Sequence, residues 1–154
     1  MNNIEPAMQT EVYFLSNAFN CTEPKDYFIN DCCFGDDVAK WLIQQLRTQG
    51  IETSAEPDQE DFGWYFTFYV GGIEHCFVIG FQPNDPSTGD RWLGWLERRT
   101  GFLGSLFGSR KHGILPEAIQ AIDTALRASS AIRRVTWHEP GTDDEPENEQ
   151  SRDV

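Results

Sequence analysis

The densest group of residues that could do chemistry lies between positions 31 and 37, where Asp31, Cys32, Cys33, Asp36 and Asp37 occur together. A thiol at the start of a helix has a lowered pKa, so this group could support a thiol-dependent enzyme around residues 31–36. A cysteine nucleophile also needs a histidine within reach, and the sequence places none of the three histidines there. We therefore favour a simpler interpretation, in which the acids cap a helix and the thiols are buried. We assign no catalytic residue.

Metal and cofactor sites are not indicated either. His75 and Cys76 are neighbours in an apolar run, and neighbours on a strand point to opposite faces of a sheet. One ligand from this strand and one from the pair Cys32 and Cys33 would leave a site short of the usual three or four ligands. The glycines between 101 and 113 do not have the spacing of a phosphate-binding loop. We expect no metal and no cofactor.

Aromatic and basic residues gather between positions 91 and 111 in an otherwise acidic chain. Such residues are enriched at interface hot spots, and a basic amphipathic segment can also lie on an anionic membrane. This pattern suggests a peripheral adaptor that contacts a partner or a membrane. The alternative, in which the aromatics fill the core and the arginines pair with acids, stays open. The candidate contact residues are Trp92, Trp95, Arg98 and Arg99.

An acidic stretch precedes an aromatic one near the middle of the chain. Its candidate partner-binding residues are Glu56, Asp58, Glu60, Asp61 and the adjoining Trp64. The chain has 12 Lys and Arg against 25 Asp and Glu, a formal net charge of -13. Such a charge repels nucleic acid at long range, so we exclude nucleic acid and expect a basic protein as the partner. The alternative is a solvated surface without a partner.

The elements that must position these residues follow from periodicity. Apolar residues at three- and four-residue spacing predict helices over 36–49 and 116–128, with Pro116 at the first position of the second helix. Gly71 and Gly72 separate two aromatic and β-branched runs, which predicts a hairpin of 64–70 with 73–81. We expect a loop over the acidic stretch 56–61 and a helical turn near 102–107. Further strands are predicted over 12–15, 26–30, 51–53, 91–98 and 132–137.

This order predicts an α+β fold, a two-layer sandwich with a mostly antiparallel sheet and two main helices packed on one face. Residues 1–138 form one domain, and 139–154 form a disordered acidic tail that holds seven acids and one base. The chain shows no apolar leader and no transmembrane segment, so we expect a cytoplasmic protein with reduced thiols. The oligomeric state is not determined by these patterns.

The strands WYFTFYVGG and IRRVTW in a small acidic domain are similar in general style to bacterial single-domain proteins. Some of those are immunity proteins, which neutralise toxins through acidic surfaces. No motif carries the resemblance, so no functional residue is transferred from it. Together with the charge and the missing catalytic set, it favours a non-catalytic protein-binding module, immunity-like in character.

Overall fold

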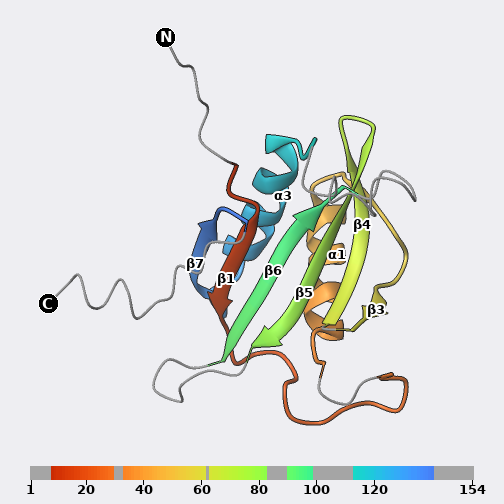
Figure 1. Cartoon of the computed structure of the whole chain (residues 1–154), viewed down its shortest axis with the longest axis vertical. Coiled ribbons are helices and arrows are strands. Elements are labelled where there is room, and N and C mark those ends of the chain that lie inside the picture. Colours follow the sequence, from red (N-terminus) through yellow and green to blue (C-terminus); the bar gives the residue numbers. More distant parts are fainter. Residues whose placement is uncertain (1–7, 30–32, 62, 83–89, 99–112, 141–154) are drawn as a thin grey trace, which may run out of the picture.

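A computed structural model of the chain describes residues 8–29, 33–61, 63–82, 90–98 and 113–140. Figure 1 shows an open antiparallel sheet with two helices behind it. The strands are β1 (Glu11–Leu15), β2 (Glu52–Thr53), β3 (Asp58–Glu60), β4 (Gly63–Val70), β5 (Ile73–Gln82), β6 (Arg91–Glu97) and β7 (Arg133–His138). The helices are α1 (Asp36–Thr48) and α3 (Pro116–Arg127). The α+β class and the mostly antiparallel sheet are confirmed.

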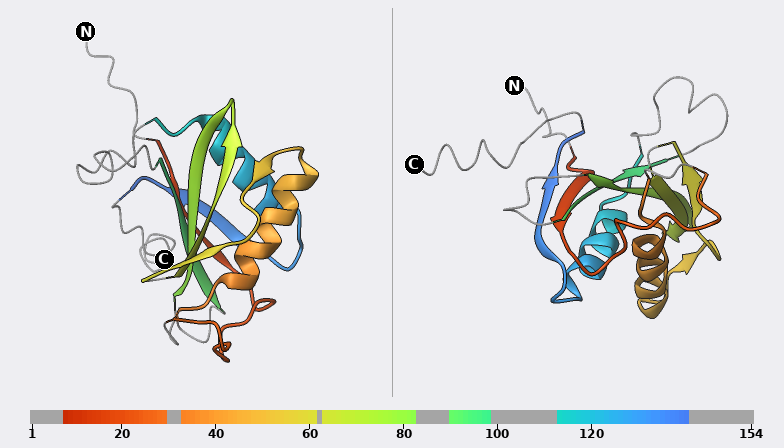
Figure 2. Two further views of the ribbon diagram at one scale, coloured as in Figure 1. Left: turned by 90° about the vertical axis from the view of Figure 1, so that its right-hand side faces the viewer. Right: turned by 90° about the horizontal axis from the view of Figure 1, so that it is seen from below.

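The sheet has the strand order β2-β4-β5-β6-β1-β7, and β3 also pairs with β4. Each strand pairing within the described ranges is antiparallel. The chain turns between β4 and β5 at Gly71 and Gly72, whose φ angles are 58° and 74°, as the predicted hairpin requires. Figure 2 shows α1 and α3 on the same side of the sheet.

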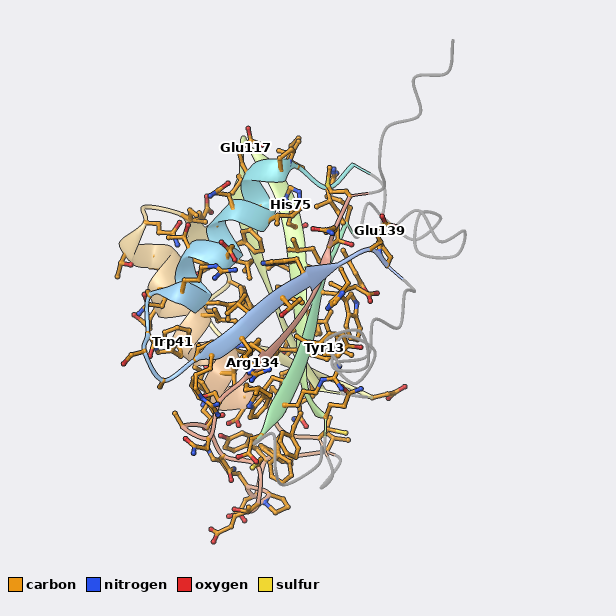
Figure 3. The ribbon with its side chains drawn as sticks, turned by 90° about the vertical axis from the view of Figure 1, so that its left-hand side faces the viewer. Tyr13, Trp41, His75, Glu117, Arg134 and Glu139 are labelled. Carbon is orange, nitrogen blue, oxygen red and sulfur yellow. The ribbon has the colours of Figure 1, made fainter. Side chains whose placement is uncertain are left out.

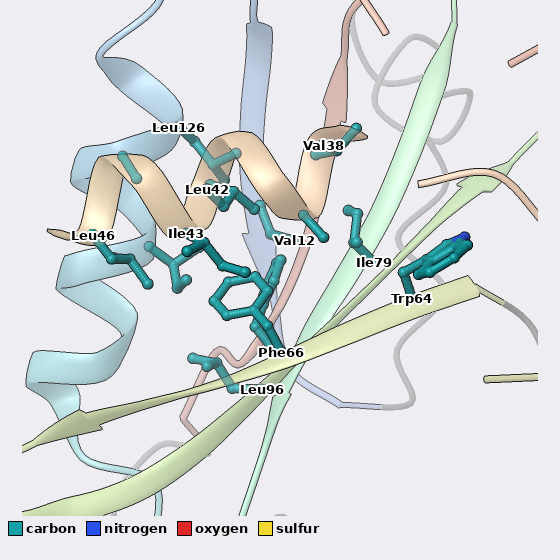
Figure 4. Packing of buried hydrophobic residues seen from close by; sticks show 14 of the residues in the cluster. Val12, Val38, Leu42, Ile43, Leu46, Trp64, Phe66, Ile79, Leu96 and Leu126 are labelled. Atoms are coloured by element: carbon teal, nitrogen blue, oxygen red, sulfur yellow. The ribbon is translucent and has the colours of Figure 1, made fainter. Parts of the chain in front are cut away.

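The core lies between the helices and the sheet (Figure 4). From α1, Val38, Leu42 and Leu46 are fully buried, so the predicted apolar face of this helix is confirmed. Alternate residues of the strands point toward the helices, among them Trp92 and Leu96 of β6. The residues of β6 that alternate with these belong to the opposite face of the sheet; they are Arg91, Leu93, Trp95 and Glu97.

Three predictions about local structure were wrong. The part of 26–30 that the structure describes is a turn, because its aromatic residues are used for packing: Phe28 is buried against Phe34 and Trp64. The expected loop over 56–61 contains β3, which pairs with the outer edge of β4.

The third wrong prediction was helix capping by the acids at the start of α1. The N-cap is Gly35, with φ 137°, and no side chain caps the helix. Asp36 is instead buried beneath the preceding turn.

Several other predictions fall on residues outside the described ranges. They concern Asp31, Cys32, Arg99, the helical turn near 102–107 and the tail from 141 onward. Across the described ranges, neither helix has the length and apolar character needed to span a membrane.

Candidate functional site

A short segment before α1 lies against the edge of the sheet and presents two apolar side chains to solvent. Tyr27 is 48% exposed and Ile29 is 77% exposed. The side chain of Gln59, on β3, makes two hydrogen bonds to the backbone of this segment. Its Nε2 donates to the carbonyl of Tyr27 at 2.7 Å, and its Oε1 accepts from the backbone N–H of Ile29. The backbone of both residues is therefore held beside β3.

The buried ring of Trp64 packs against Tyr27. Trp64 is only 4% exposed, and its ring meets the Tyr27 ring edge to face at a centroid distance of 6.1 Å. Its Nε1 donates to the carbonyl of Cys33 at 3.0 Å. The sequence placed Trp64 in the partner surface, whereas the structure places it under that surface, where it supports Tyr27.

Three of the predicted acidic residues are exposed along the same edge of the sheet: Glu56, Asp58 and Asp61. Glu60 belongs to β3 through its backbone pairing with Gly63, and its side chain lies outside the description. We call the surface formed by Tyr27, Ile29, Glu56, Asp58 and Asp61 the acidic edge. Large exposed apolar side chains rimmed by charge are typical of protein interfaces.

A buried carboxylate fixes the phenol of Tyr27. The Tyr27 hydroxyl donates to Oδ2 of Asp36, which is fully buried. The same oxygen pairs with Lys25 Nζ at 3.3 Å and lies 3.9 Å from Lys40 Nζ. Within the described residues Oδ1 of Asp36 has no hydrogen-bond partner. Both lysines keep about half of their side-chain surface in water (40% and 49% exposed). The buried Asp36 therefore anchors the turn through its bonds to Tyr27 and Lys25.

The residues considered for thiol chemistry are only partly brought together. Cys33 is half-buried, and its Sγ donates to the carbonyl of Asp61 at 3.2 Å. Cys76 is buried and Cys21 is half-buried, so the expectation of mostly buried thiols holds for Cys76 alone among the described cysteines. Burial and a hydrogen bond to Asp90 raise the pKa of the Cys21 thiol, which keeps it protonated at neutral pH.

His75 is used in packing rather than presented to a site. It is fully buried on the helix side of the sheet, stacked on Phe68. Its Nδ1 lies 3.1 Å from the carbonyl of Ile73, and its Nε2 accepts from the backbone N–H of Leu115 at 3.1 Å. Burial, followed by the positive charge of Arg98, lowers the pKa of this imidazole. Within the described ranges no three His, Cys, Asp or Glu side chains could hold a metal ion.

The aromatic and basic residues of β6 divide between the two faces of the sheet. Trp92 is fully buried on the helix side, where its Nε1 donates to the carbonyl of Ser16 at 3.0 Å. Trp95 is half-buried on the other side, and its Nε1 donates to Glu97 at 2.7 Å. Arg98 donates to the carbonyl of Gly113 at 3.1 Å. Core filling therefore accounts for Trp92, and the adaptor role of 91–111 stays a prediction for the rest.

Arg91 is one of the basic residues of the stretch 91–111, and its burial was not predicted from the sequence. It is 8% exposed, and its guanidinium carbon lies 3.9 Å from the centroid of the Tyr13 ring. Among the described residues its buried Nε has no hydrogen-bond partner, and none of the ion pairs between these residues involves Arg91. Stacking on tyrosine contributes about 0.5–2 kcal/mol. Burying an ion costs several kcal/mol, so this stack alone does not compensate for it.

No protein-family model, curated protein or solved structure matches this chain. Its function is therefore inferred from the geometry of its own residues.

Proposed function

We propose that this protein is a non-catalytic protein-binding module, immunity-like in character, that docks a basic protein partner on the acidic edge. The observation that supports the proposal is the clamping of Tyr27 and Ile29 by Gln59 next to exposed acids. A segment whose backbone is already held in place loses less conformational entropy on binding, so its exposed apolar side chains are suited to contact a partner.

The charge of the chain favours a basic partner. The surrounding acids attract a basic surface and suppress acidic competitors, while the apolar pair supplies the buried contact. The proposal keeps the organisation expected from the sequence, a two-layer cytoplasmic domain at 1–138 and an acidic tail at 139–154. The tail adds negative charge that would increase the rate of encounter with a basic protein.

Two polar residues that could take part in catalysis have structural hydrogen-bond partners instead. Asp36, the buried carboxylate closest to the acidic edge, is engaged by Tyr27, Lys25 and Lys40. His75 accepts its hydrogen bond from Leu115, at the start of α3 rather than of α1. Neither Asp36 nor His75 therefore has a thiol among its hydrogen-bond partners in the described residues.

The test is capture of partners from native lysate on the immobilised full chain, quantified by mass spectrometry. We expect a basic protein to be retained at low salt, lost at high salt, and lost from Ile29→Asp and from Asp58→Lys with Asp61→Lys. The control is Glu23→Lys with Glu117→Lys, which makes the same change of charge at exposed positions outside the acidic edge. Equal recovery on the acidic-edge variants and on this control contradicts the proposal.

A further inference from the structure

The face of the sheet turned away from the helices carries a second set of residues, independent of the acidic edge. Figure 3 shows Tyr13 on this face, with His75 on the helix side. Tyr13 contacts the guanidinium of Arg91 on one side, and its ring meets the ring of His138 at a centroid distance of 5.3 Å. Arg91 is thus held by β1 in a defined position with its planar group stacked.

A hollow of about 220 Å³ is lined by Gly80, Phe81, Gln82, Leu93 and Trp95, and one of these, Gln82, is the cross-strand neighbour of Arg91. The strand register places Gln82 directly opposite Arg91, and Gly80 opposite Leu93. Leu93 and Trp95 follow Arg91 at two-residue spacing on β6, so all three share a face. A charged group and an apolar hollow therefore adjoin along one strand.

Two buried polar atoms at this place have no partner within the described residues. They are Nε of Arg91, a donor, and Oε1 of Gln82, an acceptor. A buried cation is normally paired with an anion, and a guanidinium binds a carboxylate through two parallel hydrogen bonds. The cation is present here, and the described residues supply no anion for it.

We propose that this face binds a small organic carboxylate, with its anionic group on Arg91 and its apolar body in the hollow over Leu93 and Trp95. The volume is below that of sites for drug-sized molecules, so the apolar body is about the size of one ring or a short chain. A chain with a net charge of -13 repels anions at long range, which disfavours purely ionic ligands. The apolar body must therefore contribute to affinity.

The test uses three probes: benzoate, benzyl alcohol as its neutral analogue, and inorganic phosphate as an anion without an apolar body. Binding to the full chain is measured by calorimetry and by the indole N–H resonance of Trp95, assigned with Trp95→Phe. We expect benzoate to bind at least tenfold more tightly than either other probe. Arg91→Gln should weaken benzoate at least tenfold and leave benzyl alcohol unchanged.

A second variant keeps the test independent of Arg91, whose replacement could affect folding. Gly80 lines the hollow and has no positive φ, so the strand backbone accepts Gly80→Val, and we expect the added side chain to occupy the hollow and abolish benzoate binding. Arg133→Gln, at an exposed position of β7, is the matched control and should bind as the natural chain does. The proposal is overturned if benzoate fails to bind, if benzyl alcohol or phosphate binds equally well, or if Arg91→Gln binds benzoate unchanged.

Discussion

The imidazole of His75 accepts a hydrogen bond from the backbone N–H of Leu115, so a side chain in the sheet holds the N-cap residue of α3. Protonation of Nε2 would remove this acceptor. Burial lowers the pKa of His75 below its ordinary value of 6.5, so the unfolded chain takes up protons more readily than the folded one. This contribution to stability is complete above pH 6.5 and is lost as the pH falls below it.

We expect the free energy of unfolding in urea to decrease between pH 7.5 and pH 5.5. His75→Gln retains an acceptor near the position of Nε2 and does not titrate, so its unfolding free energy should fall less over this range. Equal slopes in the natural chain and in this variant would show that His75 is not responsible.

The bond between Tyr27 and Asp36 should be measurable by removing a single oxygen atom. Tyr27→Phe should lower the free energy of unfolding by about 1–2 kcal/mol, because a hydrogen bond to a buried charged group is stronger than a neutral one. Tyr69→Phe is the control, since Tyr69 donates to Glu74 at 3.3 Å on the exposed surface. The control should change stability by about 0.5 kcal/mol at most. Equal effects of the two variants would argue against Asp36 as the anchor of the turn.

Gly63 allows β4 and β5 to approach closely. A Cβ at this position would lie 2.2 Å from the carbonyl oxygen of Ile79, a backbone atom that cannot turn away. We expect Gly63→Ala to lower the free energy of unfolding by about 3 kcal/mol, at the upper end of the range for overpacking. Gly72→Ala gives the comparison, because nothing lies within 4 Å and only its φ of 74° is unfavourable.

The Gly72 variant should cost about 1 kcal/mol, the usual penalty for a left-handed residue. Chemical denaturation of both variants tests the order. A Gly63→Ala protein as stable as the Gly72→Ala protein would mean that β4 can shift away from β5 at little cost.

The candidate site was only partly predictable. Acids near Trp64 were identified from sequence, since a charge run beside an aromatic residue is visible in a single segment. Tyr27, Ile29 and Gln59 were missed as members of the same surface. Tyr27 and Ile29 lie in a segment that has the composition of a strand. Nothing in that segment shows that Gln59, 30 residues after Ile29, forms a hydrogen bond with it. Arg91 was noted only as a basic residue, because its stacking on Tyr13 depends on the register of β1 and β6.

The sequence by itself determined the two helices, through their apolar period, and the hairpin at Gly71 and Gly72, through the backbone angles that glycine allows. These features depend on interactions between residues close in the chain. Only the tertiary structure decided that 26–29 is a turn, that β3 pairs with β4, and that Asp36 and Arg91 are buried. Each of these depends on contacts between distant segments, whose geometry is set when the sheet and helices pack together.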